Sequence, residues 1–239
     1  LLPTDIVGGM VYSPKSGQFT FRPGPVFCNV LLGDEINRAS PRTQSALLEA
    51  MSERQVSVEG RRHSLQAPFL VLATQNPIEY HGTYPLPEAQ LDRFAMRLCI
   101  GYPGEEAELN MVTDQRESHP LESLRPVAAK EDILELAQQV KQVTVDESVV
   151  RYMLRVVRDT RHEPRLTLGA SPRAVLVLYR TCQALALLRE RRYVIPDDVR
   201  ELAVPVIAHR LVVETKAGYS GVKRETLVSE VLDGIAPPV

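Results

Sequence analysis

Tryptophan is absent from this 239-residue sequence, and aromatic residues together make up only 5% of it. An excess of charge of either sign is missing as well, because 28 basic and 30 acidic residues leave a formal net charge of −2. Nucleic-acid-binding proteins neutralise phosphates with Lys and Arg, and many stack bases on aromatic rings. The composition therefore argues against a nucleic-acid-binding protein, although a local basic patch is compatible with it.

Cysteines and long apolar runs are scarce too. The sequence has no Cys-x-x-Cys pair, and its five histidines are scattered without the spacing of metal ligands. We expect free, buried thiols in a reducing compartment. No apolar run reaches the length of a membrane span, and the first residues do not resemble a signal peptide, so the expected location is the cytoplasm. The three cysteines are Cys28, Cys99 and Cys182.

A phosphate-binding loop of the form Gly-x-x-x-x-Gly-Lys-Ser/Thr is also missing. Such a loop needs its glycines because closely spaced backbone N–H groups must surround the phosphates. The nearest candidate, residues 218–223, lacks a glycine directly before its lysine and does not stand between a strand and a helix. This sequence therefore offers no such loop of its own for the phosphates of a nucleotide.

The residues up to about 101 show the pattern of an α/β fold. Two apolar runs, 26–32 and 69–74, are continuous enough for central strands of a parallel sheet covered on both faces. A helix begins between them at Ser40, an N-cap residue followed by Pro41. This order of strand, helix and strand predicts a βαβ unit. Two further segments with alternating polarity and turn residues, 9–25 and 55–68, predict β-hairpins.

The residues from 102 to 239 show helical spacing instead. Apolar side chains recur every three to four positions, and prolines occupy the linkers, which predicts a separate helical bundle. The two domains are thus expected at 1–101 and 102–239. The five expected helices are 105–117, 130–142, 146–160, 171–191 and 196–212.

Polar side chains follow both apolar runs of the first part. Asp34 and Glu35 come directly after the first run, and Asn76 follows the second. Parallel strands deliver such residues to the carboxyl edge of the sheet, where open α/β sheets bind ligands. One acid can hold Mg²⁺ while the next orients or deprotonates a water, and a neutral amide can hold that water and a phosphate. Taken singly, each feature also has a structural interpretation, such as an Asx-turn before Pro77.

The segment LPEAQLDRF, residues 86–94, makes the pattern specific. It resembles the stretch after the second sensor strand of AAA+ ATPases, whose arginine reaches the nucleotide of a neighbouring subunit. A guanidinium there offsets charge on the transferring phosphate and contributes roughly 10³–10⁵ in rate. The alternative is that Arg93 simply pairs with Asp92 or with another surface acid.

Together these segments resemble the MoxR family of AAA+ ATPases. The resemblance implies an AAA+ core with a parallel sheet flanked by helices, followed by a helical lid. It implies that Asp34 and Glu35 are the Walker B acids, with Asp34 binding Mg²⁺, that Asn76 is the sensor 1 residue and that Arg93 is the arginine finger. Arg173, at the start of a lid helix capped by Ser171, corresponds to sensor 2. The matching segments are GDEINRA (33–39), LLEAM (47–51), ATQNPIE (73–79), GTYPLPEAQ (82–90), LDRF (91–94), LGASPRA (168–174) and VIPDDV (194–199).

The same resemblance implies that the P-loop, with its strand and helix, lies upstream of the first residue. The expected activity is then ATP hydrolysis in a ring, expected to be a hexamer, that remodels a client protein, with a von Willebrand factor A domain protein as a further partner. The chain by itself is expected to be inactive, and its two hairpins to face the central pore. Two other interpretations stay open: a non-hydrolysing assembly module, and a nucleic-acid motor that uses the basic hairpin tip at Arg61, Arg62 and His63.

Overall fold

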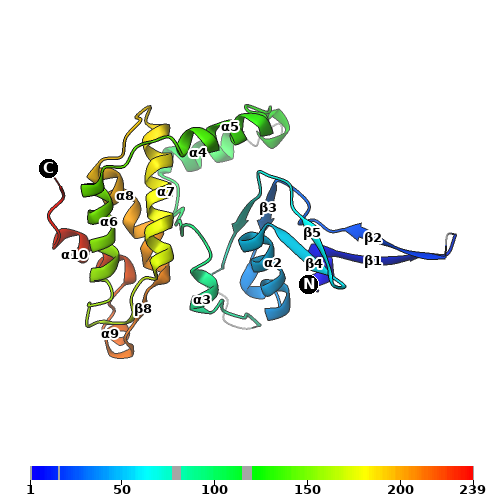
Figure 1. Ribbon diagram of the computed structural model, residues 1–239, viewed down its shortest axis with the longest axis horizontal. Coiled ribbons are helices and arrows are strands. Elements are labelled where there is room, and N and C mark those ends of the chain that lie inside the picture. The colour runs from blue at the N-terminus through cyan, green and yellow to red at the C-terminus, as the bar shows by residue number, and fades with distance from the viewer. Residues whose placement is uncertain (1, 16, 77–81, 115–119, 239) are drawn as a thin grey trace.

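The computed structural model describes residues 2–15, 17–76, 82–114 and 120–238 (Figure 1). Strands β1 to β6 and helix α2 lie together on one side of the molecule, and helices α6 to α8 and α10 on the other. The short helix α3 (Glu88–Leu91) lies between them. Residue Pro77 of the second polar motif and residues 115–117 of the first expected lid helix lie outside the described residues.

A βαβ unit forms the centre of the first part. Strand β3 (Val30–Gly33) pairs in parallel with β6 (Leu70–Ala73), and Gly33 stands opposite Ala73. Helix α2 (Pro41–Glu53) follows β3 after a 3₁₀ turn, and its N-cap Ser40 accepts a hydrogen bond from the Thr43 amide. Leu47 of α2 packs with Ile36 and Leu86 in a small buried cluster under one face of the two strands. The predicted order of strand, helix and parallel strand is therefore confirmed.

The opposite face of these strands is open. Val30, Leu32, Leu70 and Leu72 point away from α2 and are 51–63% exposed. Side chains of a strand alternate between its faces, so α2 can cover only the other set. Among the described residues nothing covers the second face, and the expectation of cover on both faces is not met. Continuous apolar runs do fit a sheet that has two covered faces, which explains the expectation.

Both expected hairpins are present. Strand β1 (Gly8–Ser13) pairs antiparallel with β2 (Gln18–Pro23), and β4 (Gln55–Val58) pairs antiparallel with β5 (Arg61–Ser64). The β1–β2 ribbon follows the short helix α1 (Pro3–Val7) and extends away from the body of the molecule (Figure 1). Phe21 of β2 stacks on His63 of β5 with ring centroids 4.0 Å apart, so the two hairpins contact each other.

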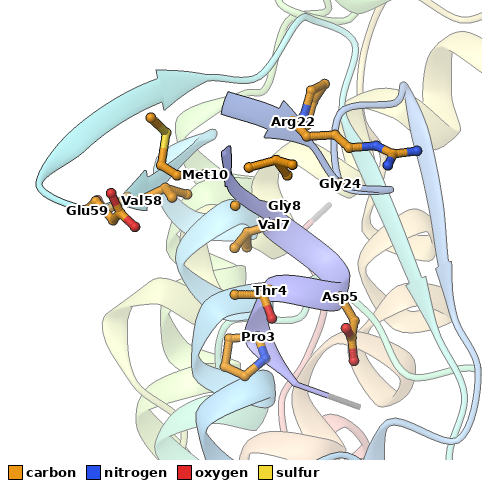
Figure 2. Close-up of a pocket in the computed structure, with 14 residues that line it drawn as sticks. Pro3, Thr4, Asp5, Val7, Gly8, Met10, Arg22, Gly24, Val58 and Glu59 are labelled. Atoms are coloured by element: carbon orange, nitrogen blue, oxygen red, sulfur yellow. The ribbon is translucent and has the colours of Figure 1, made fainter. Parts of the chain in front are cut away.

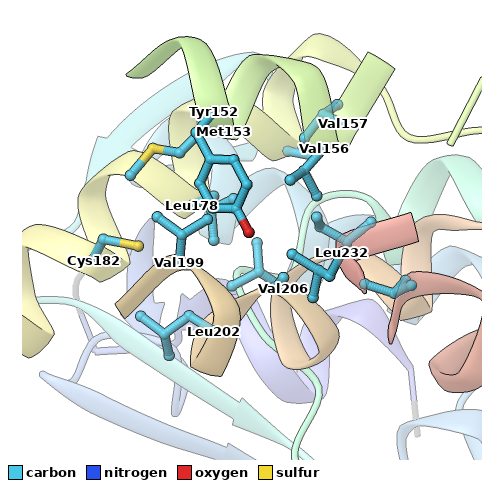
Figure 3. Packing of buried hydrophobic residues seen from close by; sticks show 14 of the residues in the cluster. Tyr152, Met153, Val156, Val157, Leu178, Cys182, Val199, Leu202, Val206 and Leu232 are labelled. Carbon is cyan, nitrogen blue, oxygen red and sulfur yellow. The ribbon is translucent and has the colours of Figure 1, made fainter. Parts of the chain in front are cut away.

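The helical part has the largest core of the molecule (Figure 3). Met153 and Val156 of α6, Leu178 and Cys182 of α7 and Val206 of α8 are fully buried in it. The helices of this part are α4 (Glu105–Asp114), α5 (Lys130–Val140), α6 (Glu147–Asp159), α7 (Pro172–Leu188), α8 (Pro196–Ile207), α9 (Thr215–Tyr219) and α10 (Arg224–Asp233).

The structure differs from the expected helices mainly near the C-terminus. Helix α8 was expected to reach residue 212 but ends at Ile207, where a 3₁₀ turn η3 (Ala208–Arg210) and the short strand β8 (Val212–Val213) follow. Strand β8 pairs with β7 (Leu166–Leu168), and α10 packs onto the core; neither was expected from the sequence. Among the described residues, no helix combines the length and hydrophobicity that a membrane span requires.

Candidate functional site

The carboxyl ends of β3 and β6 form the edge at which the site was expected. The parallel register continues for one residue beyond the strands, because the Thr74 amide donates to the Gly33 carbonyl at 3.0 Å. The chain then crosses back, and the Ile36 amide donates to the Thr74 carbonyl, also at 3.0 Å. These bonds place the residues after β3 directly beside those after β6, and we call this edge the rim.

Thr74 links the two acidic residues at the rim. The Glu35 amide donates to Thr74 Oγ1 at 2.9 Å, and the Thr74 hydroxyl donates to Asp34 Oδ1 at 2.5 Å. Glu35 has a left-handed backbone conformation, with φ at 49°, which non-glycine residues adopt rarely. This turn directs the carboxylates of Asp34 and Glu35 to different partners.

Glu35 and Asn76 meet at the rim although 41 positions separate them. Asn76 Nδ2 donates to Glu35 Oε1 at 3.3 Å, while Arg38 Nη1 lies 3.1 Å from Glu35 Oε2. The buried side chain of Asn37 donates to the Asn76 backbone carbonyl at 3.4 Å and so steadies the turn that carries Asn76. The structure thus brings together three of the expected site residues, Asp34, Glu35 and Asn76. The ion pair to Arg38 was not expected.

Arg93 lies elsewhere. Its Nη1 donates to Ser52 Oγ at 2.6 Å, near the end of α2. The start of α2 contacts the rim, because Gln44 Nε2 donates to the Ile36 carbonyl at 3.2 Å. Ser52 is eight residues farther along this helix, about 12 Å at 1.5 Å per residue. Arg93 is therefore not brought to Glu35 and Asn76 within this chain. Among the described residues it forms no ion pair with Asp92 or with another surface acid, the alternative considered from the sequence.

Arg173 belongs to a cluster around Asp92. Its Nη1 is 3.9 Å from Asp92 Oδ2, and Ser171 Oγ donates to both carboxylate oxygens of Asp92 at 3.1 and 3.2 Å. Ser171 stands at the N-cap of α7, but its side chain makes no bond to its own helix. A nearby carboxylate also offsets a cation at the positive end of a helix. The unusual position of Arg173 therefore has a local explanation that the sequence did not reveal.

Comparison with known proteins identifies the relatives of this chain. Residues 1–96 match the ATPase family associated with various cellular activities (AAA), and residues 158–231 match the AAA lid domain. The chain is 48% identical to Uncharacterized protein YeaC of Bacillus subtilis, over the whole chain and 75% of that protein. It is 42% identical to Chaperone MoxR1 of Mycobacterium tuberculosis, over the whole chain and 65% of that relative's length.

More distant relatives agree. Protein MoxR of Paracoccus denitrificans is 30% identical over 98% of the chain and 74% of that protein. A crystal structure from Cytophaga hutchinsonii has a TM-score of 0.90 at 37% identity, over the whole chain and 75% of that structure. This chain belongs to the MoxR family of AAA+ ATPases. Its parallel strands, flanking helix and helical lid are accordingly those of the AAA+ fold.

The residues of this MoxR-family chain fit one part of a nucleotide site. AAA ATPases use a nucleotide together with Mg²⁺, and carboxylate oxygens are the ligands that Mg²⁺ prefers. Asp34 offers such an oxygen, since its Oδ1 binds Thr74 and Oδ2 has no hydrogen bond to any residue that the structure describes. The described residues hold no cluster of three or more potential metal ligands. They therefore fit an ion that takes most of its ligands from phosphates and water, as Mg²⁺ does in ATPases.

A hollow of the surface lies away from the rim. A pocket of about 660 Å³ lies between α1, the base of the β1–β2 hairpin and the β4–β5 turn, and Val7, Gly24 and Glu59 line it (Figure 2). None of the five site residues expected from the sequence lines this pocket. The candidate nucleotide site of this MoxR-family chain is the rim, and this pocket is not part of it.

Sequence reasoning missed Arg210. This residue is buried in η3, and its Nη1 donates to Asp92 Oδ1 at 2.6 Å. Burial lowers the pKa of the Arg210 guanidinium below its ordinary value, and Asp92 opposes that shift. The available signal was the pair His209-Arg210 within an otherwise apolar segment, because buried charges are rare unless they are paired.

Proposed function

We propose that the full-length protein containing this chain hydrolyses ATP, with Glu35 as the residue that activates the attacking water. One observation carries the proposal: the Glu35 carboxylate and the Asn76 amide lie 3.3 Å apart at the carboxyl ends of two parallel strands. Open α/β sheets bind their ligands at this edge. Residues 1–101 would supply the acids and the amide of the site, and residues 102–239 would form the lid.

We assign each rim residue a separate task in this proposal. Arg38 binds Oε2 of Glu35, so Oε1, which accepts a hydrogen bond from Asn76 Nδ2, would also accept a proton from a water bound beside the two side chains. The Asn76 amide can donate to that water without adding negative charge near a phosphate. Asp34, held through Thr74, would bind Mg²⁺. When bound, Mg²⁺ and ATP supply the neutralising charge and the phosphoric anhydride that is cleaved.

A ring arrangement accounts for the two arginines that are away from the rim. Arg93 is held near the far end of α2, and Arg173 lies beside Asp92. In a ring with head-to-tail contacts, one surface of each subunit meets a different surface of the next. Arg93 would then reach the nucleotide of a neighbour. Arg173 would contact either its own nucleotide or a neighbouring one. We propose a hexamer as the ring.

The proposed cellular task is chaperone-like remodelling of a client protein. One relative is named Chaperone MoxR1, and the β1–β2 ribbon, which extends away from the body, is a candidate surface for contact with another protein (Figure 1). A von Willebrand factor A domain protein is the proposed companion. The three cysteines are free, although only Cys182 is buried as expected, whereas Cys28 is half-buried and Cys99 is exposed. Free thiols suit work in the reducing cytoplasm.

The experiment that tests the proposal is Glu35→Gln in the full-length protein. The amide keeps the shape of the side chain but cannot accept a proton, so we expect turnover to fall at least about 100-fold while ATP stays bound. Glu59→Gln at the exposed β4–β5 turn is the matched control and should hydrolyse ATP at the wild-type rate. Wild-type hydrolysis by the Glu35→Gln protein would contradict the assignment. A wild-type protein that binds ATP without cleaving it would indicate a non-hydrolysing assembly module.

A further inference from the structure

Arg210 of the lid holds the turn that carries Arg93. Its side chain is 1% exposed, and each of its five N–H groups has an acceptor. Four of the five bonds end on residues 92–95: Nη1 donates to the carbonyl and the Oδ1 of Asp92, both at 2.6 Å, and Nη2 donates to the carbonyls of Phe94 at 2.6 Å and Ala95 at 3.3 Å. The fifth bond joins Nε to the Val206 carbonyl of α8 at 2.7 Å. A single guanidinium therefore binds the chain on both sides of Arg93.

Other lid residues hold the same turn. His209 Nε2 lies 3.1 Å from the Phe94 carbonyl, and Ser171 at the start of α7 donates to Asp92. The Arg97 amide donates to the Pro205 carbonyl of α8 at 2.9 Å. The Arg93 side chain takes no part in these contacts and bonds to Ser52 of α2. The lid thus fixes the backbone of the turn while the Arg93 guanidinium projects to the surface.

A role for Arg210 in stabilising the contact between the lid and the turn, and nothing more, explains this arrangement poorly. Taking a guanidinium out of water is costly, and apolar side chains of similar volume often stabilise an interface as well as a buried ion pair does. A planar fork offers something that apolar contacts lack, namely a fixed direction for the carbonyl groups that it binds. The direction of the carbonyls at 92, 94 and 95 determines where the side chain of residue 93 leaves the backbone.

We propose that Arg210 is a positioning residue for Arg93: it joins the turn 92–95 to the lid and so makes the position of the arginine finger follow the lid. The inference rests on the proposed function of Arg93. A lid that moves when its own nucleotide site fills or empties would carry this finger with it. The occupancy of one site would then affect hydrolysis at the neighbouring site, which is a coupling between two sites.

The test is a double-mutant cycle in the full-length protein with Arg210→Lys and Arg93→Ala. Lysine keeps the charge but cannot bind several carbonyls in one plane. We expect Arg210→Lys to lower kcat about tenfold, since small misplacements of catalytic groups cost about that much or more, and to leave KM for ATP within about twofold. In the Arg93→Ala background the same substitution should have no further effect on kcat, because the residue it positions is gone.

A second readout does not depend on activity. Amide hydrogen exchange of residues 93–97 should be faster in Arg210→Lys than in wild type, with the Arg97 amide as the direct reporter of the contact with Pro205. The matched control is Arg191→Lys, which disturbs another lid ion pair, to the fully buried Asp198, away from the turn. Arg191→Lys should leave both kcat and the exchange of residues 93–97 unchanged.

Several outcomes would overturn the inference. If Arg210→Lys lowers kcat by the same factor with and without Arg93, or if Arg191→Lys lowers it equally, Arg210 is structural only. If Arg93→Ala alone hydrolyses ATP at the wild-type rate, the proposed function of Arg93 fails and the inference with it. Should Arg210→Lys not fold, Ser171→Ala serves in the same cycle, because its side chain bonds Asp92 and not its own helix. We expect Ser171→Ala to lower kcat about twofold in the wild-type background and to have no effect on kcat in the Arg93→Ala background. An equal loss of kcat in both backgrounds overturns the inference.

Discussion

At the scale of single residues, Thr74 is the side chain that orders the rim. Its hydroxyl accepts from the Glu35 amide and donates to the Asp34 carboxylate, so it fixes the start of the turn that both acids share. A hydrogen bond to a charged group at a partly exposed site contributes modestly to stability. Its larger effect is on orientation, because the same bonds determine where the two carboxylates point.

We therefore predict that Thr74→Val affects activity more than stability. Valine has the same shape but no hydroxyl, so the free energy of unfolding should fall by only about 0.5–1 kcal/mol, measured by urea denaturation. ATP turnover of the full-length protein should fall about tenfold, because the two acids lose their common anchor. Thr74→Ser, which keeps the hydroxyl, is the control and should retain most of the activity. Equal turnover in the Val and Ser variants would show that the hydroxyl is dispensable.

The sequence allowed part of the rim to be predicted, and the reason is geometric. Residues that follow two adjacent parallel strands must meet at one edge, so the meeting of Glu35 and Asn76 followed from locating the strands. The pairing of Arg38 with Glu35 depends on the left-handed turn at Glu35, which no sequence pattern announces. The contact of Arg210 with Asp92 joins residues 118 positions apart, and it depends on how the lid packs against α3.

At the scale of elements, the β1–β2 hairpin depends on close backbone contact at its base. Gly24 lies against Gly8 and Ile6, and a Cβ atom on Gly24 would come within 2.4 Å of the Gly8 nitrogen and the Ile6 oxygen. No side chain fits there without a shift of the backbone. These glycines also line the pocket beside the hairpin (Figure 2).

We predict that Gly24→Ala loosens this hairpin and lowers the free energy of unfolding by about 1–3 kcal/mol, as overpacking does elsewhere. Urea denaturation gives the global effect, and faster amide exchange in β1 and β2 locates it. Gly104→Ala is the control, because a Cβ on Gly104 would meet nothing within 4 Å. If the two substitutions lower the free energy of unfolding equally, close contact at the hairpin base is not the reason why position 24 requires glycine.

Elements with a strong local pattern were predictable, and short ones were not. Both hairpins show alternating residues and a turn, and most lid helices have apolar residues at helical spacing. The pairing of β7 with β8 involves strands of three and two residues, too short to show a period. Helix α10 buries Leu227, Val228 and Leu232, and their spacing of one and four positions is that of a helix face.

At the scale of the whole molecule, the expected site residues at the rim and the expected arginine finger lie in different parts of the chain. The rim carries Glu35 and Asn76, whereas Arg93 is held near the far end of α2 on a turn fixed by the lid. A chain that holds both halves of a site apart cannot use them on the same nucleotide without a large rearrangement. We propose that assembly in a ring resolves this, because the arginine of one subunit would then complete the rim of the next.

The measurement that tests this account most directly is a mixing experiment with the full-length protein. Glu35→Gln and Arg93→Ala should each keep only a small residual activity alone, at most about a hundredth of the wild-type rate, since each removes one half of every site. In an equal mixture about a quarter of the subunit contacts would combine an intact rim with an intact finger, and ATP hydrolysis should recover to about that fraction of the wild-type rate. A mixture that forms rings yet stays as inactive as either variant alone would contradict a site shared between subunits.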